Sequence, residues 1–488
     1  MLLNRKPIIK ILFAVMAIVG AAMLLPCFVA LYYKESKAAI SFAVCAVPMV
    51  IAGLSVVKIL PKEDNTVLRM RDGFFIVAFA WIIMSALGAL PFVISGSIPS
   101  FVDAFFETAS GFSTTGSSII PDVEVLPRGI LFWRSFTHWL GGMGVLVLTI
   151  ALLPMLGIGG QKIMRAETTG PTMDKISFTT NESARNLYII YGGMTVVEIL
   201  LLKLGGAGFF DAAAHTFGTV GTGGLSVYGD SIGHYGSVYL EMVIGVFMML
   251  AGVNFGLYYF LFSGKAKQMF RDTELRVYIT IIACATIFIA IILTIQNFYG
   301  SIWESLRYSF FQVVSIITTT GYGTTDFDLW PVVCKVVLFL LMIVGGCASS
   351  TGGGVKVIRV ILTFKIIKRA ADKRLHGKAV KPIKLGGKNV SEETLAGIKS
   401  FMILFFMTIL LGTFIVALDG YDLETTLTAV VACVSNIGPG FALVGPTCNF
   451  LFFSAPVKIV LALLMIAGRL ELYTIFLMFT PVFWDENR

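Results

Sequence analysis

The sequence predicts an all-α polytopic membrane protein in which four similar units surround one axis and two extra transmembrane helices precede them. Three observations predict this fold. Of the 488 residues, 57% are hydrophobic and 14% are charged, and the mean hydropathy of +0.86 lies far from that of soluble domains. Apolar runs long enough to cross a membrane follow one another along the chain. Shorter apolar runs, each ending in a polar segment that contains glycine, lie between some of them.

Ten runs are long enough to span, since a helix needs about 20 residues to cross a hydrocarbon core of about 30 Å. They cover residues 9–33, 38–60, 74–97, 129–157, 186–204, 237–263, 277–296, 331–367 with an interruption, 397–418 and 457–480. The first run shows no signal-peptide cleavage site, so we expect a spanning helix there. Lys and Arg gather after the even-numbered runs, which predicts that both termini are cytoplasmic. This topology accounts for most of the net charge of +8, so nucleic-acid binding is not expected.

Four further apolar runs are too short to cross, because a helix of about 11 residues reaches only about halfway. They cover residues 104–112, 212–219, 309–317 and 426–434. The segments that follow them read STTGSS (113–118), VGTGGLS (220–226), TTTGYG (318–323) and SNIGPG (435–440). Aligned at Gly116, Gly223, Gly321 and Gly438, they reveal a fourfold repeat of helix, half-helix, glycine loop and helix.

This repeat divides the chain into five parts. Residues 1–70 form the N-terminal helix pair, and the four repeats cover 71–165, 166–275, 276–392 and 393–488. The third repeat also holds an interrupted span and a basic cytoplasmic segment.

The glycine loops carry the functional prediction. Irregular backbone cannot face lipid, so these loops must be buried in protein or line a water-filled path. Glycine permits conformations that aim carbonyl oxygens inward, as in a potassium selectivity filter, and TTGYG at 319–323 has the composition for it. The C-terminal end of a half-helix aimed at such a path also favours a cation.

On these motifs the chain resembles the Trk/Ktr/HKT superfamily of potassium transport proteins, and its extra helix pair makes it more similar to the Trk membrane subunit than to the shorter Ktr subunit. The resemblance implies a filter that binds the transported K⁺. The residues implied are Thr114, Thr115, Gly116, Val220, Gly221, Thr222, Gly223, Thr319, Thr320, Gly321, Tyr322, Asn436, Ile437 and Gly438. Only the third loop has GYG, and Pro439 follows the fourth glycine. We therefore expect a less sharp preference for K⁺ over Na⁺ than four identical loops would give.

The eighth span is interrupted at about mid-membrane by GGCASSTGGGVK, residues 345–356. Three successive glycines do not sustain a helix there without tertiary support. The segment is not a phosphate loop, because no Ser or Thr follows Lys356. The resemblance implies a mobile gate loop below the filter, and the alternative is a helix kink. The gate residues implied are Gly345, Gly346, Ser349, Ser350, Thr351, Gly352, Gly353 and Gly354.

Arg469 lies about halfway along the last span, where a charge is costly and should face a cavity or a partner. The resemblance implies that it forms an electrostatic barrier under the filter and contacts the gate loop. The alternative is a buried ion pair with a carboxylate elsewhere, such as Glu198. His138, in the fourth span, is interpreted as a packing residue, with a proton relay as its alternative.

The sequence contains no metalloprotease, hydrolase or metal-ligand motif, so an enzyme is not expected. Repeats of the same polarity favour channel-like conduction, whereas Glu198 and Glu241 keep a proton- or sodium-coupled symporter open. The resemblance implies a homodimer in the bacterial inner membrane, regulated by a TrkA-like cytosolic nucleotide-binding ring. No organic cofactor is expected in this chain. The basic strip at 365–388 is a candidate docking site for that ring or for anionic lipid.

Overall fold

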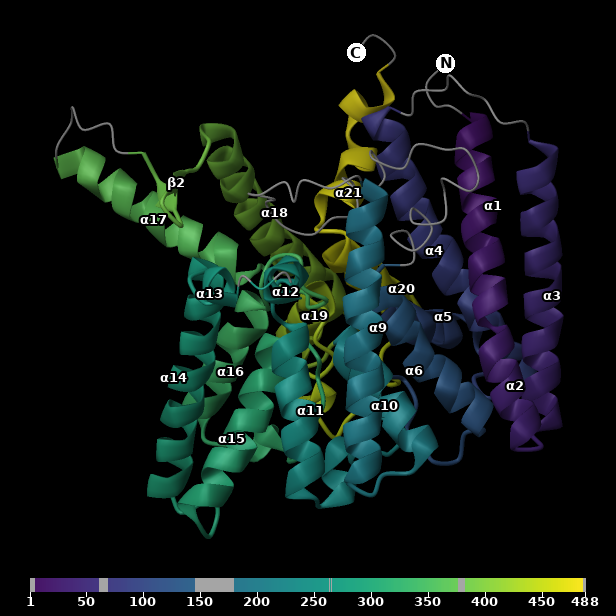
Figure 1. Ribbon diagram of the computed structural model, residues 1–488, viewed down its shortest axis with the longest axis horizontal. Coiled ribbons are helices and arrows are strands. Elements are labelled where there is room, and N and C mark those ends of the chain that lie inside the picture. Colours follow the sequence, from purple (N-terminus) through teal and green to yellow (C-terminus); the bar gives the residue numbers. More distant parts are fainter. Residues whose placement is uncertain are drawn as a thin grey trace.

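The computed structural model describes residues 5–60, 69–144, 180–262, 264, 266–375 and 382–485. The described chain is mostly helical, which confirms the all-α prediction (Figure 1). Its one sheet is a hairpin of β1 (Lys384–Leu385) and β2 (Lys388–Asn389).

In the N-terminal pair, α1 (Arg5–Ala22) and α2 (Leu24–Tyr32) together form the first span, and α3 (Ser36–Ile59) forms the second. Small residues allow α1 and α3 to approach closely. A Cβ placed on Gly53 would lie only 2.5 Å from the carbonyl oxygen of Phe13. On the other side, Gly129 of the first repeat packs in the same way against Ala30 of α2. The pair is thus attached to the outside of the repeats (Figure 1).

Four units of outer helix, half-helix and inner helix follow. The outer helices are α4 (Met70–Ser95), α9 (Thr180–Leu204), α14 (Thr273–Ile295) and α18 (Glu392–Val416). The half-helices are α5 (Phe101–Phe112), α10 (Phe209–Gly221), α15 (Ile302–Ile317) and α19 (Leu423–Ser435). The inner helices are α6 (Arg128–Gly142), α11 (Val238–Ala251) with α12 (Phe255–Phe262), α16 (Val332–Val344) with α17 (Val357–Leu375), and α20 (Ala455–Arg469) with α21 (Tyr473–Phe476).

Short helical turns complete the described chain. They are α13 (Ala266–Met269), η2 (Ser231–Tyr235), η3 (Phe327–Leu329), η4 (Ala417–Asp419), η5 (Ala442–Val444), η6 (Leu477–Phe479) and η7 (Pro481–Trp484). The chain enters with α1 and leaves with η7 on the same side (Figure 1). On that side the Arg71 side chain donates to the backbone oxygen of Asp485 at 2.9 Å.

Each half-helix begins a few residues before its apolar run. Ser100, Ser301 and Asp422 cap α5, α15 and α19 by accepting the backbone N–H three residues later, at 3.4, 3.2 and 2.9 Å. An acidic residue in the first turn interrupts the apolar pattern there, and it suits the positive end of the helix dipole.

The units close into a ring because the inner helix of each packs on the half-helix of the next. Thus α6 packs on α10, α11 on α15, α16 on α19, and α20 returns to α5. This arrangement confirms the predicted fourfold architecture around one axis. The half-helices are consequently surrounded by protein, and their side chains are largely buried.

Two of the ten predicted spans are sharply bent and are not continuous helices. α11 and α12 meet at 98°, and α20 meets the segment Tyr473–Phe479 at 112°. At the first bend, the Asn254 side chain accepts the N–H of Gly256 at 2.8 Å and so starts a new helix. At the second, Glu471 and Leu472 have φ values of 55° and 62°, which end the helix. Within the described residues, six helices are long and apolar enough to span, or eight if each bent pair counts as one.

The predicted span 129–157 is described only up to residue 144, where it forms α6 and the turn after it. The rest of this span lies outside the described residues. The predicted boundary between the first and second repeats also lies outside them. The remaining predicted spans correspond to helices, with the eighth divided between α16 and α17.

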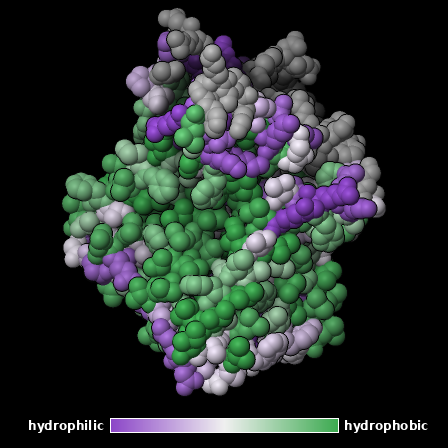
Figure 2. All heavy atoms as spheres, turned by 90° about the vertical axis from the view of Figure 1, so that its left-hand side faces the viewer, coloured by the Kyte–Doolittle hydropathy of each residue, from purple (hydrophilic) through white to green (hydrophobic). Residues whose placement is uncertain are grey.

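The outer surface is apolar. Figure 2 shows a broad hydrophobic region on the face that carries α14 and α18, with hydrophilic residues concentrated toward the ends. Ile287 and Ile295 of α14 and Leu410 and Phe414 of α18 are more than half exposed. Exposed aliphatic residues over this area are expected where lipid is the solvent.

Candidate ion pathway

All four half-helices end in the same turn. The residue that leaves the helix has a left-handed backbone, with φ near 55° at Thr114, Thr222, Thr319 and Asn436. The N–H of the following residue then donates to the carbonyl five positions earlier. These bonds join Thr115 to Ser110, Gly223 to Gly218, Thr320 to Ser315 and Ile437 to Ala432, at 2.7–3.0 Å. The identical pattern aligns the four loops residue by residue.

This alignment corrects the predicted register of the second loop. The glycines with positive φ that follow the turn are Gly116, Gly224, Gly321 and Gly438, with φ of 84°, 72°, 87° and 102°. Gly224, not Gly223, is therefore equivalent to the other three. Gly223 takes the position before the glycine, which Thr222 was predicted to hold. Two adjacent glycines gave the sequence no means of choosing between them.

The loops form a closed ring. A Cβ on Gly116 would lie 2.2 Å from the carbonyl oxygen of Gly223 in the next loop. The corresponding distances are 2.0 Å from Gly224 to Thr320, 2.1 Å from Gly321 to Ile437, and 2.9 Å from Gly438 back to Thr115. Each glycine thus lies against the carbonyl that precedes the glycine of its neighbour. Any side chain would displace that carbonyl, so both the positive φ and the close approach require glycine.

The other predicted filter residues lie close to this ring in different roles. Val220 and Gly221 belong to the last turn of α10. The hydroxyl of Tyr322 donates to the carbonyl of His215, in half-helix α10, at 3.0 Å. The Asn436 amide donates to Thr115 Oγ1 at 2.9 Å and so joins the fourth loop to the first.

A cavity opens on one side of the ring. The four ring glycines line it, together with Ser117, Ser118, Ser226 and the segment from Val444 to Phe450. Arg134 is the charged residue among those that line this cavity.

The segment 345–356 fills the other side of the ring. It is an irregular loop between α16 and α17, longer than a helix kink. The N–H of Gly353 donates to Thr319 Oγ1 at 2.6 Å, and a Cβ on Gly352 would lie 2.7 Å from the carbonyl oxygen of Thr318. The Lys356 ammonium donates back to the carbonyl of Gly352. The loop therefore lies directly against the ends of the half-helices.

The same loop is attached to the bend between α11 and α12. The N–H of Cys347 donates to the carbonyl of Gly252 at 2.9 Å, and the N–H of Phe255 donates to the carbonyl of Ser349 at 3.1 Å. A Cβ on Gly346 would lie 3.2 Å from the Gly252 carbonyl oxygen. The bend between α11 and α12, which was not predicted from the sequence, is thus the part of the chain on which the segment 345–356 packs.

Glu274, in the first turn of α14, holds both ends of the loop. Its Oε1 accepts the N–H of Ala348 at 2.8 Å and that of Ile358 at 3.0 Å. Glu274 was not among the predicted site residues, because an acidic residue in a first helical turn is ordinary and its acceptor role depends on residues far along the chain.

Arg469 is the last residue of α20, at the bend, and not the middle of a continuous helix as predicted. Its guanidinium donates to the carbonyl of Thr351 in the loop at 2.5 Å and to those of Gly141 and Gly142 at 2.7 and 2.5 Å. The alternative ion pair with Glu198 is not formed, since neither Glu198 oxygen has a hydrogen-bond partner among the described residues. Glu471 instead pairs with Arg359.

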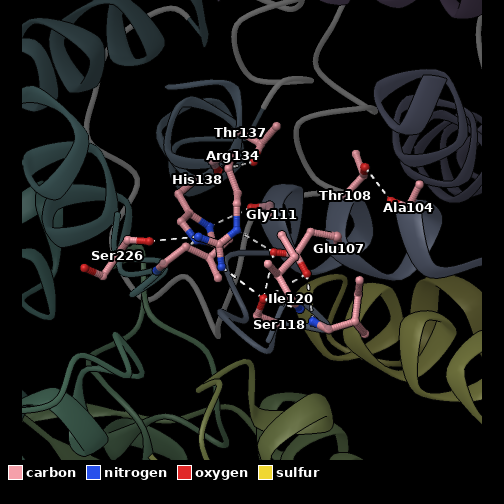
Figure 3. Close-up of polar contacts among 12 residues, drawn as sticks. Ala104, Glu107, Thr108, Gly111, Ser118, Ile120, Arg134, Thr137, His138 and Ser226 are labelled. Atoms are coloured by element: carbon pink, nitrogen blue, oxygen red, sulfur yellow. Dashed lines mark hydrogen bonds and ion pairs between the residues drawn. The ribbon is translucent and has the colours of Figure 1, made fainter. Parts of the chain in front are cut away.

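Behind the ring, Arg134, Glu107 and His138 form the polar cluster drawn in Figure 3. His138 Nδ1 lies 2.8 Å from the carbonyl oxygen of Gly111, and its Nε2 is 3.3 Å from the N–H nitrogen of Leu225. Its ring also fills the space beside Gly223. These contacts give His138 the packing role that was predicted.

Glu241, on α11, accepts two hydrogen bonds from the guanidinium of Arg307, at 2.7 and 2.5 Å.

This geometry defines a class: a helical membrane protein in which four glycine-containing loops, each after a half-helix, meet in a ring of glycines and backbone carbonyls. Backbone carbonyls are ligands suited to cations. Comparisons with known proteins agree. A family model described as TrkH, cation transport protein, matches residues 40–485. The chain belongs to the TrkH family of cation transport proteins, which also confirms that it is not an enzyme.

Relatives match over almost their whole length. The chain is 35% identical over 487 residues to the Trk system potassium uptake protein TrkH of Salmonella typhimurium, covering 99% of this chain and 100% of the relative. It is 36% identical over 471 residues to TrkG of Escherichia coli, covering 95% of each. The crystal structure of the potassium transporter TrkH from Vibrio parahaemolyticus matches with a TM-score of 0.88 at 32% identity, over 99% of this chain and 100% of that one.

Proposed function

We propose that this chain is the membrane subunit of a Trk-type potassium uptake system and that K⁺ crosses through the ring of four loops. The observation that carries the proposal is the closed ring itself, in which four backbone carbonyls meet four glycines. Relatives named as potassium uptake proteins support potassium as the cation.

In this proposal the carbonyls of Thr115, Gly223, Thr320 and Ile437 replace part of the hydration shell of K⁺. The helix C-termini that precede them add partial negative charge toward the ion. The four loops differ in sequence, so we expect the preference for K⁺ over Na⁺ to be moderate.

The loop 345–354 serves as the gate. It lies against Thr318 and Thr319 and obstructs the exit from the ring. Arg469 adds a positive charge at the same level and is hydrogen-bonded to the loop, so it both repels cations and ties the gate in place.

The protein resides in the bacterial inner membrane as a homodimer with both termini in the cytoplasm. A cytosolic nucleotide-binding ring of the TrkA type docks on the basic segment 365–388, which follows directly from the gate through α17. The proposal keeps the predicted division of the chain into residues 1–70, 71–165, 166–275, 276–392 and 393–488.

Coupled symport with protons is the second candidate. It is favoured by Glu198, a fully buried carboxyl group of α9 without a hydrogen-bond partner among the described residues. Such a group could gain and lose a proton during transport. Glu241 does not support this candidate, because Arg307 already neutralises it.

The test is potassium flux into proteoliposomes of the purified chain, with sodium for comparison and the membrane potential held constant. Passive flux that prefers K⁺, with a preference reduced in Gly321→Ser, supports the channel-like pore. Flux that requires a proton gradient and is lost in Glu198→Gln supports symport. A matched control is Gly193→Ala, since a Cβ at this position meets no atom within 4 Å.

A further inference from the structure

Glu107 is an almost completely buried carboxylate behind the first loop. It accepts hydrogen bonds from the N–H of Ile119 at 2.9 Å and from the hydroxyl of Ser118 at 3.1 Å, both just after the ring glycine. Arg134, buried on α6, donates its Nε to the same carboxylate at 2.6 Å. The half-helix is thus joined to the strand of chain that leaves the ring.

Arg134 extends this network to the second loop. Its Nη1 donates to the carbonyl of Ser226 at 2.8 Å, and its Nη2 donates to the Ser118 hydroxyl at 3.0 Å (Figure 3). Ser226 follows Gly224 as Ser118 follows Gly116. One guanidinium therefore fixes the outgoing chains of two neighbouring loops relative to each other.

In every unit, a half-helix residue at or next to the position of Glu107 contacts the chain that leaves the loop. It lies nine positions before the ring glycine in three units and ten before it in the fourth. We call these four the brace residues: Glu107, His215, Gln312 and Thr428. Each reaches the chain that leaves its own loop.

The other three brace residues contact the outgoing chain through hydrogen bonds that involve no carboxylate or guanidinium group. His215 Nε2 lies 2.9 Å from Ser226 Oγ, and Gln312 contacts Thr324 at a longer 3.4 Å. Thr428 Oγ1 accepts the N–H of Phe441 at 3.0 Å. Among the four brace residues of the described structure, only Glu107 forms an ion pair with a residue of an inner helix, Arg134 of α6.

We propose that Glu107 and Arg134 are positioning residues that set the geometry of the first and second loops and thereby the preference of the ring for K⁺ over Na⁺. The inference rests on the proposed function of the ring. Charge-assisted hydrogen bonds are roughly twice as strong as neutral ones. Since no other brace joins two loops through a guanidinium within the described residues, loosening this one leaves the two loops free to shift relative to each other.

The experiment compares K⁺ and Na⁺ flux in proteoliposomes of the full chain for Glu107→Gln, Glu107→Gln with Arg134→Gln, and Ser118→Ala. The matched control is Glu241→Gln, which removes the charge of another buried glutamate, one paired with the partly exposed Arg307. The hydrogen bonds of that pair join α11 to α15 and involve no ring loop. We expect the K⁺/Na⁺ flux ratio to fall about tenfold in Glu107→Gln and in the double variant, and less in Ser118→Ala. The control should keep the wild-type ratio.

Total flux separates positioning from charge. Glu107→Gln leaves an unpaired guanidinium beside the cavity that Arg134 lines, so total cation flux should also fall. The double variant removes that charge and should recover total flux without recovering the ratio. A merely structural role would reduce the amount of folded protein, and both ions would decline together.

Three results overturn the inference or its basis. An unchanged ratio in both Glu107→Gln and Ser118→Ala, with a K⁺-preferring wild type, refutes the positioning role alone. If the charge variants do not fold, an unchanged ratio in Ser118→Ala, which loses only a hydroxyl, refutes it as well. A wild type without preference for K⁺ refutes the proposed function, and the inference with it.

Discussion

Neutralising Arg469 should open the pore. In Arg469→Gln, the bond to the Thr351 carbonyl is lost or weakened, and so are those to Gly141 and Gly142. Only the first of these holds the gate loop itself. A hydrogen bond to a charged group contributes about 1.5–3 kcal/mol, so the balance between closed and open loop should move by about 10- to 150-fold.

The lost charge acts in the same direction. At an effective dielectric constant of about 20, two unit charges about 4 Å apart repel by about 4 kcal/mol, and a cation below the ring meets that repulsion. Both effects raise flux. Flux stops increasing once the loop is open most of the time. The expected increase in flux is therefore near the lower end of the range, about tenfold.

The assay is K⁺ flux in proteoliposomes without any partner protein, normalised to reconstituted chain. Arg469→Lys separates the two effects, because lysine keeps the charge but cannot direct a planar fork at carbonyls on two elements. If the tether dominates, the lysine variant should conduct nearly as well as Arg469→Gln. If the charge dominates, it should remain near wild type. Lys458→Gln, which removes another buried cation from the same helix, is the control.

Wild-type or lower flux in Arg469→Gln, with normal yield and normal flux in the control, would refute both parts of this reasoning. It would mean that the loop is held by its remaining contacts alone and that the charge lies off the ion path.

Three further predictions use the same flux assay or thermal unfolding. Glu274→Gln should raise K⁺ flux several-fold, because charge-assisted bonds at both ends of the gate loop become neutral ones. Glu304→Gln, also in a first helical turn but of α15, should leave the flux unchanged, and equal flux in the two variants would contradict the role of Glu274 in holding the loop. Gly224→Ala should abolish flux because its Cβ would lie 2.0 Å from a ring carbonyl, whereas Gly193→Ala should retain it, and a conducting Gly224→Ala would reject the corrected register. Tyr322→Phe loses one buried hydroxyl bond worth about 1 kcal/mol, so the detergent-solubilised variant should melt about 1 °C lower and show a reduced K⁺/Na⁺ ratio. An unchanged ratio would show that this bond does not shape the ring.

The sequence was sufficient for features that local signals determine. The length of an apolar run separates a spanning helix from a half-helix, and a glycine-containing polar segment marks where the half-helix must end. These rules located α5, α10, α15 and α19 and the interruption between α16 and α17. They failed at the bends after Ala251 and Arg469, where the run of apolar residues continues although the helix does not.

The remaining site depended on distant partners. Arg469 contacts Thr351, 118 positions away, and Gly141, 328 positions away. Nothing in the residues around Arg469 indicates which carbonyls it meets. Gly223 and Gly224 show the same limit at short range, because only backbone angles and the carbonyl of the neighbouring loop distinguish them.

The attachments of the gate loop suggest how a signal from the cytoplasm would reach it. α17 starts at Val357, and the N–H of Ile358 is one of the two that Glu274 accepts. A displacement of α17 along its axis would therefore pull first on this bond. The second Glu274 bond, to Ala348, lies beside the contacts with Gly252, so release of one end weakens the hold of α14 on the other. Arg359, one residue further along α17, is paired with Glu471 at the bend that positions Arg469. A partner that moved α17 would thus act together on the Glu274 hydrogen bonds and on the Arg469 hydrogen bond to Thr351. A modest force would then free a loop that is held by α14, by the bend after α11 and by Arg469.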